Sequence, residues 1–198
     1  FFYVNFIFSS GSFIFAVKVN TFYLNMEFQL TKAKAEEASL LTSLIREVWN
    51  GMEQQEWFAP EEGENYIRQL IEQEKGVAWI ATDTASEKIA GLFLIVYPGK
   101  DNPDNLGRDI SLPEHELNLV AHMDTVVVHP SFRGYGLQRK LTAKAEEELR
   151  AAGYRYLLCT VHPDNCFSRI NMEKAGYRCV KQVLKYGGLP RLILMKEV

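Results

Sequence analysis

The hydrophobic and polar residues of this chain follow two periods, one typical of β-strands and one typical of amphipathic helices. Between Leu40 and Trp49, for example, pairs of apolar residues recur at helical spacing, and Asn50 and Gly51 predict the end of this helix. The elements expected in the first half are a strand at Phe28–Thr31, helices from about Ala33 to Asn50 and from Pro60 to Gly76, and a strand pair at Val77–Asp83 and Lys88–Tyr97.

The second half opens with a long segment that shows no periodicity. Residues 98–116 are rich in Pro, Gly, Asn and Asp, and a loop of this length in a compact domain is usually functional or disordered. The elements expected after it are a strand at Leu117–Val128, a helix at Leu137–Ala152, a strand at Tyr156–Val161, a helix at Asn165–Ala175, and a closing hairpin of Arg178–Tyr186 and Leu189–Val198. The resulting order, β-α-α-β-β-β-α-β-α-β-β, predicts one α/β domain over residues 26–198.

The first 25 residues differ from the rest of the chain, because they contain seven phenylalanines and a single charged residue, Lys18. They lack the basic start and small-residue cleavage site of a signal peptide, and polar residues interrupt the apolar run that a membrane span requires. We expect residues 1–25 to be an apolar extension outside the functional domain, with an anchor and a packed element as the alternatives. For residues 26–198 we expect no membrane association.

Composition and charge narrow the class of protein. Hydrophobic residues make up 47% of the chain and charged residues 24%, as in ordinary globular domains. A formal net charge of −3 leaves no excess of Lys and Arg to neutralise phosphates, so nucleic acid is not expected as the main partner. The three cysteines, Cys159, Cys166 and Cys179, form no CxxC pair, which favours reduced thiols in the cytoplasm over disulfides or a zinc site.

The segment from Val126 to Leu141 carries the clearest chemical signal in the chain. A β-branched run ends at Pro130, an Arg-Gly-x-Gly turn follows, and a helix begins. The two glycines have no Cβ, so the backbone can turn tightly and approach a ligand closely. The backbone amides of residues 134–138 would then converge at a helix N-terminus, where the helix dipole favours negative charge. The pattern therefore predicts a cradle for a pyrophosphate.

Two sequence motifs stand in order in this half of the chain. The first has the form Gln/Arg-x-x-Gly-x-Gly/Ala, and it is carried by Arg133, Gly134, Gly136 and, with a departure from the pattern, Gln138. The second is carried by Asn165, Ser168, Glu173, Lys174, Gly176 and Tyr177. In these motifs and in its order of elements, the chain resembles the GNAT superfamily of acyl-CoA-dependent N-acetyltransferases. Over residues 117–181 the two motifs support the resemblance, whereas over residues 26–116 only the order of the elements supports it.

The resemblance implies a fold and a cosubstrate. The fold is a single domain with a mixed, mostly antiparallel sheet flanked by helices, in which the fourth and fifth strands splay apart. Acetyl-CoA is expected in the resulting cleft, with its pantetheine arm along the fourth strand and its pyrophosphate on the amides of the turn. The cofactor-binding residues implied are Val126, Val127, Val128, Arg133, Gly134, Tyr135, Gly136, Leu137, Gln138, Asn165 and Ser168. Asn165 could equally cap the helix that follows it.

Acetylation of an amine needs a base that keeps the acceptor nitrogen unprotonated. Alternation along the fourth strand places Asn118, His122 and Asp124 on one face, just before the cofactor turn. We expect His122 or Asp124 to be the base, acting directly or through water. His122 is the first choice because imidazole titrates near neutral pH. The alternative is that these polar groups pair with neighbouring strands or lie at a wet edge.

The resemblance also points to a position for the proton donor to the leaving thiolate. Many family members have a tyrosine five residues before the last aromatic residue of the second motif, whereas this chain has Met172 there. Tyr177 is the nearest replacement along the sequence, although a core aromatic is the other interpretation of that residue. A CoA thiol titrates at about 8–9, like cysteine, so the thiolate could also leave unassisted.

Two further interpretations compete with an acetyltransferase. His122 and Asp124 match the His-x-Asp pattern of dinuclear zinc peptidases, but the further carboxylates of such a site are not in place, so we expect no metal. A non-catalytic acyl-CoA-binding or regulatory domain on the same fold is the stronger rival, because fold does not imply function. The acidic residues of segment 98–116 weakly favour a cationic amine as acceptor, and the closing hairpin could form the edge of a homodimer.

Overall fold

The computed structural model describes residues 26–58 and 63–198, and the predictions for residues 1–25 and for a helix start at Pro60 lie outside the described residues. The strands are β1 (Phe28–Lys32), β2 (Gly76–Asp83), β3 (Ile89–Val96), β4 (Val120–Val128), β5 (Tyr156–Val161), β6 (Arg178–Lys185) and β7 (Leu189–Glu197). The α-helices are α1 (Ala38–Asn50), α2 (Glu64–Glu72), α3 (Leu106–Asp109), α4 (Leu137–Ala151) and α5 (Cys166–Lys174). The periodicity of the sequence predicts each of these elements except α3.

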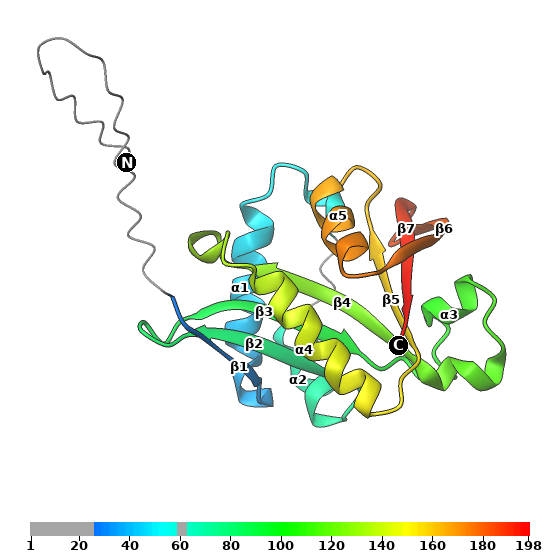
Figure 1. Cartoon of the computed structure of the whole chain (residues 1–198), viewed down its shortest axis with the longest axis horizontal. Helices are drawn as coiled ribbons and strands as arrows, with labels where there is room; N and C mark the ends of the chain where they lie inside the picture. Colours follow the sequence, from blue (N-terminus) through cyan, green and yellow to red (C-terminus); the bar gives the residue numbers. More distant parts are fainter. Residues whose placement is uncertain (1–25, 59–62) are drawn as a thin grey trace, which may run out of the picture.

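The described strands form one sheet in the order β1-β2-β3-β4-β5-β7-β6 (Figure 1). Neighbouring strands are antiparallel except β4 and β5, which run parallel and pair only over residues 120–122 and 156–158. Beyond that point β4 and β5 separate, and the side of β4 that faces β5 meets no described strand from Met123 to Val128. The predicted α/β fold with splayed fourth and fifth strands is therefore confirmed. We call the space between the two strands the wedge.

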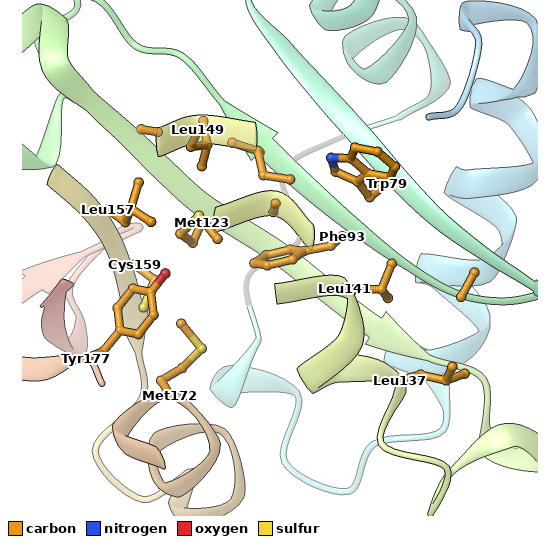
Figure 2. Close-up of a cluster of buried hydrophobic side chains, with 14 of the residues drawn as sticks. Trp79, Phe93, Met123, Leu137, Leu141, Leu149, Leu157, Cys159, Met172 and Tyr177 are labelled. Atoms are coloured by element: carbon orange, nitrogen blue, oxygen red, sulfur yellow. The ribbon is translucent and has the colours of Figure 1, made fainter. Parts of the chain in front are cut away.

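Helices cover both faces of the sheet, and each face has its own apolar core (Figure 1). On one face, α4 presents a stripe of buried residues to the sheet, and Leu137, Leu141 and Leu149 from this stripe belong to the same core as Met123 of β4 (Figure 2). On the other face, α1 and α2 pack on the sheet. Each buried leucine contributes about 2 kcal/mol, so the start of α4 is firmly held beside the end of β4. None of the helices in residues 26–58 and 63–198 is long and apolar enough to cross a membrane.

The segment at residues 98–116 is more ordered than its sequence predicts. It contains α3 and the start of a 3-10 helix, η3 (Glu114–Leu119), so β4 begins at Val120 rather than at Leu117. The buried side chain of Asn105 organises the segment, because its oxygen accepts from the Gly107 N–H at 2.9 Å and its nitrogen donates to two backbone carbonyls. Such side-chain hydrogen bonding creates order that hydrophobic periodicity does not report.

Candidate active site

The turn between β4 and α4 has the conformation that its glycines predict. It begins with a 3-10 turn, η4 (Pro130–Phe132), and continues through Gly134 and Gly136, whose φ angles are +88° and +69°. These left-handed values favour glycine over every other residue. No atom lies within 4 Å of the place that a Cβ would take on Gly134, and at Gly136 only the end of the Arg139 side chain does so. The backbone is therefore open to a ligand at both glycines.

The backbone amides of this turn form an unoccupied set of donors. The six successive N–H groups of residues 134–139 donate no hydrogen bond to any described residue, and the Lys140 N–H is the first to join α4, donating to the Gly136 carbonyl at 3.1 Å. Gly136 caps the helix and has no side chain to accept these bonds. We call residues 134–139 the amide nest. Converging N–H groups at a helix N-terminus bind anions, because their partial positive charges add.

The amide nest opens into a cleft of about 1130 Å³. The predicted cofactor residues that line this cleft are Val126, Val127, Val128, Arg133, Gly134, Tyr135, Gly136, Leu137, Gln138 and Asn165. Ser168 is not among the described lining residues, and its backbone N–H donates to Asn165 Oδ1 at 3.0 Å. Asn165 therefore lines the cleft and also caps α5. The structure brings these residues together in one place, and their contacts with a cofactor stay a prediction.

The charges along the cleft are mostly positive. Arg133, Arg139 and Lys174 line it, are exposed, and make no ion pair with a described residue. Among the described lining residues, Glu53 is the one acid. Cations without a carboxylate partner, placed beside the amide nest, give the cleft a potential that attracts an anionic ligand.

A bulge in β4 changes which of its residues share a face. Met123 is opposite Ile95 and Thr125 is opposite Leu94, so the register with β3 skips Asp124. As a result Val126 and Val128 pack on the same core as Met123, while Val127 packs on the opposite core. The alternation that predicts one face for Asn118, His122 and Asp124 therefore does not continue beyond the bulge. It does not hold for Asn118 either, which lies in η3 before the strand begins.

His122 lies against the start of α3. Its Nε2 accepts a hydrogen bond from the Leu106 N–H at 3.0 Å, so the neutral ring carries its proton on Nδ1. Burial, followed by the charge of Lys185, lowers the pKa of His122 to about 4, against a smaller opposing effect of Asp109. Because Nε2 already accepts this hydrogen bond and Nδ1 carries the proton, the ring can take a proton from an amine only if the bond to Leu106 breaks. The hydrogen bond of His122 is an argument against the first choice that the sequence suggests, and the identity of the base stays a prediction.

Asp124 lies where the wedge opens. It comes two residues after His122, which forms the last β4–β5 pair with Leu158, and its side chain is exposed. Its Oδ2 accepts a hydrogen bond from the hydroxyl of Thr125 at 3.0 Å. None of the three predicted catalytic residues, His122, Asp124 and Tyr177, is among the described residues that line the cleft. Of the three, Asp124 is exposed, His122 is half-buried and Tyr177 is buried.

Tyr177 and Met172 belong to the core beneath α4 and α5 (Figure 2). Tyr177 is 3% exposed, and burial, followed by the charge of Glu146, raises the pKa of its hydroxyl well above the ordinary value. Met172 is 4% exposed and contributes to the lining of the cleft. The position of Tyr177 fits the core aromatic of the alternative interpretation. Its role as a proton donor stays a prediction that the packing disfavours.

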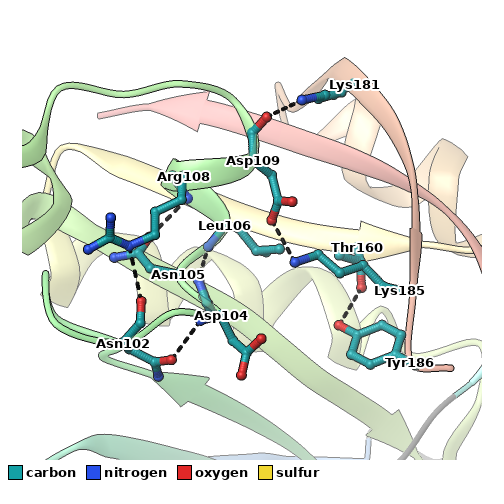
Figure 3. A network of polar contacts seen from close by, with 12 residues as sticks. Asn102, Asp104, Asn105, Leu106, Arg108, Asp109, Thr160, Lys181, Lys185 and Tyr186 are labelled. Carbon is teal, nitrogen blue, oxygen red and sulfur yellow. Dashed lines mark hydrogen bonds and ion pairs between the residues drawn. The ribbon is translucent and has the colours of Figure 1, made fainter.

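Three contacts that no sequence pattern predicts join distant segments on the side of the sheet that carries α3. Lys185 Nζ pairs with Asp109 Oδ2 at 2.7 Å, and the hydroxyls of Tyr186 and Thr160 lie 3.0 Å apart (Figure 3). The guanidinium of Arg191, which is 2% exposed, donates to the carbonyl of Glu56 at 3.0 Å. We call these three contacts the long-range contacts. The Gly187-Gly188 turn is the one sequence signal close to them, because it fixes where the hairpin reverses.

The fold is similar to that of several solved structures. Arabidopsis thaliana NAA60 in complex with acetyl-CoA is similar with a TM-score of 0.68 and 13% identity, over 87% of this chain and 99% of that chain. The acetyltransferase of the GNAT family from Streptococcus pneumoniae gives 0.66 and 16%, over 87% and 99%. The yncA protein from Salmonella typhimurium, with its cofactor acetyl-CoA, gives 0.64 and 14%, over 86% and 93%. At these identities the similarity shows the fold alone.

Comparison with curated proteins finds no similar sequence. A family model does match, over residues 41–177, and its description is the Acetyltransferase (GNAT) family. The matched range covers more than half of the chain and includes β4, the amide nest and both sequence motifs. The chain therefore belongs to the acetyltransferase (GNAT) family, which confirms the prediction, made from its two motifs, that it is an acyltransferase of this type.

Proposed function

We propose that the chain is an N-acetyltransferase that moves an acetyl group from acetyl-CoA directly to an amine acceptor. The observation that carries the proposal is the amide nest, a run of N–H donors that opens to a cleft beside Arg133 and Arg139. A pyrophosphate is a ligand that such a site fits well. The similar structures of NAA60 and yncA hold acetyl-CoA, which supports the choice of ligand.

The residues around the wedge fit the remaining parts of acetyl-CoA. The backbone of β4 from Met123 to Val128 is open on its wedge side, so the amides of a pantetheine arm can pair with it as another strand would. Arg133 and Arg139 bring positive charge to the phosphates. When bound, acetyl-CoA supplies the acetyl group as a thioester that an amine can attack. No nucleophilic side chain is needed for this chemistry.

We propose Asp124 as the base. Its exposed carboxylate lies at the opening of the wedge, where an amine can approach from the solvent. Asp124 takes the proton from the amine directly or through water, the C–N bond forms, and the C–S bond of the thioester breaks. His122 has a different role in this proposal: it fixes the start of α3 against β4 through the Leu106 N–H.

The thiolate of CoA leaves without a proton donor in this proposal. Met172 fills the position at which the family often has a tyrosine, and a thioether has no proton to give. A thiol with an ordinary pKa of about 8–9 is a good leaving group at neutral pH. Tyr177 is therefore not required for turnover.

The acceptor is proposed only as an amine. The acidic residues of segment 98–116 favour a cationic acceptor weakly. Basic side chains of this chain already neutralise part of the negative charge of the segment. Asp109 pairs with Lys185 at 2.7 Å, and Glu116 pairs with Arg155 at 3.4 Å. Polyamines, amino acids, aminoglycosides and peptides with a free lysine or N-terminus therefore belong in one panel of acceptors.

A homodimer through the closing hairpin also remains a proposal. β6 is the last strand of the sheet, so its outer edge meets no described strand and could pair with a second copy. Sedimentation or light scattering of the whole chain measures the mass directly. A monomeric mass at micromolar concentration would contradict the dimer.

Two measurements on the whole chain test the proposed activity. Calorimetry measures acetyl-CoA binding, and release of free CoA thiol over the panel of amines measures turnover. Binding with acceptor-dependent thiol release supports the acetyltransferase. Binding without turnover on any amine would favour the non-catalytic acyl-CoA-binding domain. If acetyl-CoA does not bind, both functions are wrong for this chain.

A further inference from the structure

A histidine contacts the turn that leads into the amide nest. His129 is the residue before η4, and its Nδ1 accepts a hydrogen bond from the Ser131 N–H at 3.1 Å. Its other ring nitrogen, Nε2, lies 3.0 Å from Oε1 of Glu47 in α1. A neutral imidazole has one donor and one acceptor, so the proton lies on Nε2 and is donated to Glu47. We call the contacts from Glu47 through His129 to the Ser131 N–H the His129 link.

The N–H groups of the amide nest do not fix its position. All six donate to no described residue, so they can stabilise the backbone only when a ligand accepts them. At one end the nest runs into α4, whose first residue, Leu137, is buried in the core. At the other end it follows η4, a single turn of three residues. The arrangement of the nest therefore depends on what fixes η4.

Three contacts of His129 fix the start of η4. The His129 N–H donates to the Ala90 carbonyl of β3 at 2.9 Å, which ties the turn to the sheet. The ring caps the Ser131 N–H, which is one of the donors that the start of a helical turn leaves without a backbone partner. The ring also packs on Phe132, with 5.6 Å between the ring centroids. The cap and the ring packing are separate effects, which different substitutions can remove.

We propose that His129 is a positioning residue for the cofactor. Through the Ser131 N–H it holds η4, and with it the amide nest, in the arrangement that binds a pyrophosphate. Glu47 holds the ring in the tautomer whose Nδ1 can accept. The inference rests on the proposed function, because acetyl-CoA is the ligand whose pyrophosphate the nest would bind. Without the cap, η4 can take other arrangements, and the affinity falls by the fraction of molecules that stays competent to bind.

Two substitutions separate the hydrogen bond from the packing of the ring. Asparagine keeps a side-chain oxygen that can cap the Ser131 N–H, whereas phenylalanine keeps a ring but accepts no hydrogen bond. Calorimetry on the whole chain should give an acetyl-CoA affinity about fivefold lower in His129→Phe and close to that of the unmodified chain in His129→Asn. Fivefold corresponds to about 1 kcal/mol, the net contribution of one neutral hydrogen bond. Equal weakening in the two variants, or unchanged affinity in both, would overturn the positioning role while leaving the proposed function intact.

His115 supplies the control for the loss of a histidine. It lies in η3, is exposed, and is not among the described lining residues. His115→Phe should leave the affinity for acetyl-CoA unchanged. A loss in His115→Phe as large as that in His129→Phe would overturn the proposal, because the effect would then not depend on η4.

Nitrogen-15 NMR of the histidine rings tests the His129 link without any ligand. At neutral pH the ring of His129 should carry a proton on Nε2 alone. A proton on Nδ1, with or without one on Nε2, would leave no acceptor for the Ser131 N–H and would overturn the proposal. If the proton is on Nε2 but the unmodified chain does not bind acetyl-CoA, the proposed function is wrong, and the role of His129 is wrong with it.

Discussion

Two regions of the molecule are built in different ways. The cofactor cleft is formed around consecutive residues, 126–139, which are the end of β4, a glycine turn and the start of α4. The long-range contacts join residues far apart in the chain, such as Arg191 with the carbonyl of Glu56 and Lys185 with Asp109. The first region presents backbone amides, and the second depends on side chains that reach across the molecule.

This difference determines which substitutions each region can tolerate. The amide nest offers N–H groups that nearly every residue has, so only the φ angles of its glycines restrict the sequence. Each of the long-range contacts needs a specific pair of side chains or a long side chain that reaches a backbone group. Substitutions in the nest should therefore act by displacing the backbone, whereas substitutions elsewhere act through the side chain that is lost. The four predictions that follow compare these backbone and side-chain contributions.

The largest effect is expected at Asp124. Asp124→Asn removes the proposed base while keeping the size of the side chain, so kcat should fall by about 10²–10⁴-fold. The affinity for acetyl-CoA, measured by calorimetry, should not change. Thr125→Val is the control, since it removes the hydroxyl that donates to Asp124 Oδ2 and leaves the carboxylate in place. A kcat in Asp124→Asn close to that of the control would mean that Asp124 is not the base.

Gly136 gives the sharpest test of the cofactor cleft. Gly136→Val forces a β-branched residue into φ +69°, which should displace the N–H groups of the nest. Acetyl-CoA affinity should fall on the order of 100-fold, because each lost hydrogen bond to a charged group costs about 1.5–3 kcal/mol. Gly153, just after the other end of α4, has φ +85°, so Gly153→Val carries the same kind of backbone strain away from the cleft. If both variants lose affinity equally, strain rather than the nest explains the loss.

The same contrast explains what the sequence could predict. The order of elements and the open glycine turn follow from neighbouring residues, through periodicity and the lack of a Cβ. The bulge at Asp124 depends on the register with β3, and the engagement of His122 depends on Leu106, sixteen residues away. Strict alternation therefore cannot reveal either feature. The order of segment 98–116 could not be predicted either, because it depends on the hydrogen bonds of the Asn105 side chain, which do not affect the pattern of hydrophobic residues.

His122 should make stability, rather than catalysis, depend on pH. Its pKa is about 4 in the folded protein, whereas an ordinary histidine, as in the unfolded chain, has a pKa of 6.5. A pKa lowered by folding contributes stability that is complete above pH 6.5 and is lost as pH falls toward 4. Between pH 7.5 and pH 5 the free energy of unfolding should fall by about 2 kcal/mol on this account. Chemical denaturation at the two pH values measures the difference.

His122→Gln separates this titration from every other one in the chain. Glutamine can still accept the Leu106 N–H but does not titrate in this range. The pH-dependent loss of stability should therefore shrink by about 2 kcal/mol relative to the unmodified chain. Loss of kcat in His122→Gln at constant stability would instead return His122 to the role of base.

The smallest effect is expected at Gln138, whose side chain is bonded to that of Asn171 beside the cofactor cleft. The family motif has Gly or Ala there, and in this chain Gln138 Oε1 accepts from Asn171 at 2.9 Å. Both residues line the cleft, so the bridge takes up space beside the nest that a bound phosphate would otherwise use. Gln138→Ala should therefore tighten acetyl-CoA binding by about two- to fivefold, the range set by one exposed hydrogen bond and its side chain.

Asn171→Ala breaks the same bond but keeps the glutamine. If space beside the nest is what matters, calorimetry should show tighter binding in Gln138→Ala alone. Equal tightening in the two variants would assign the effect to the bond between α4 and α5 instead.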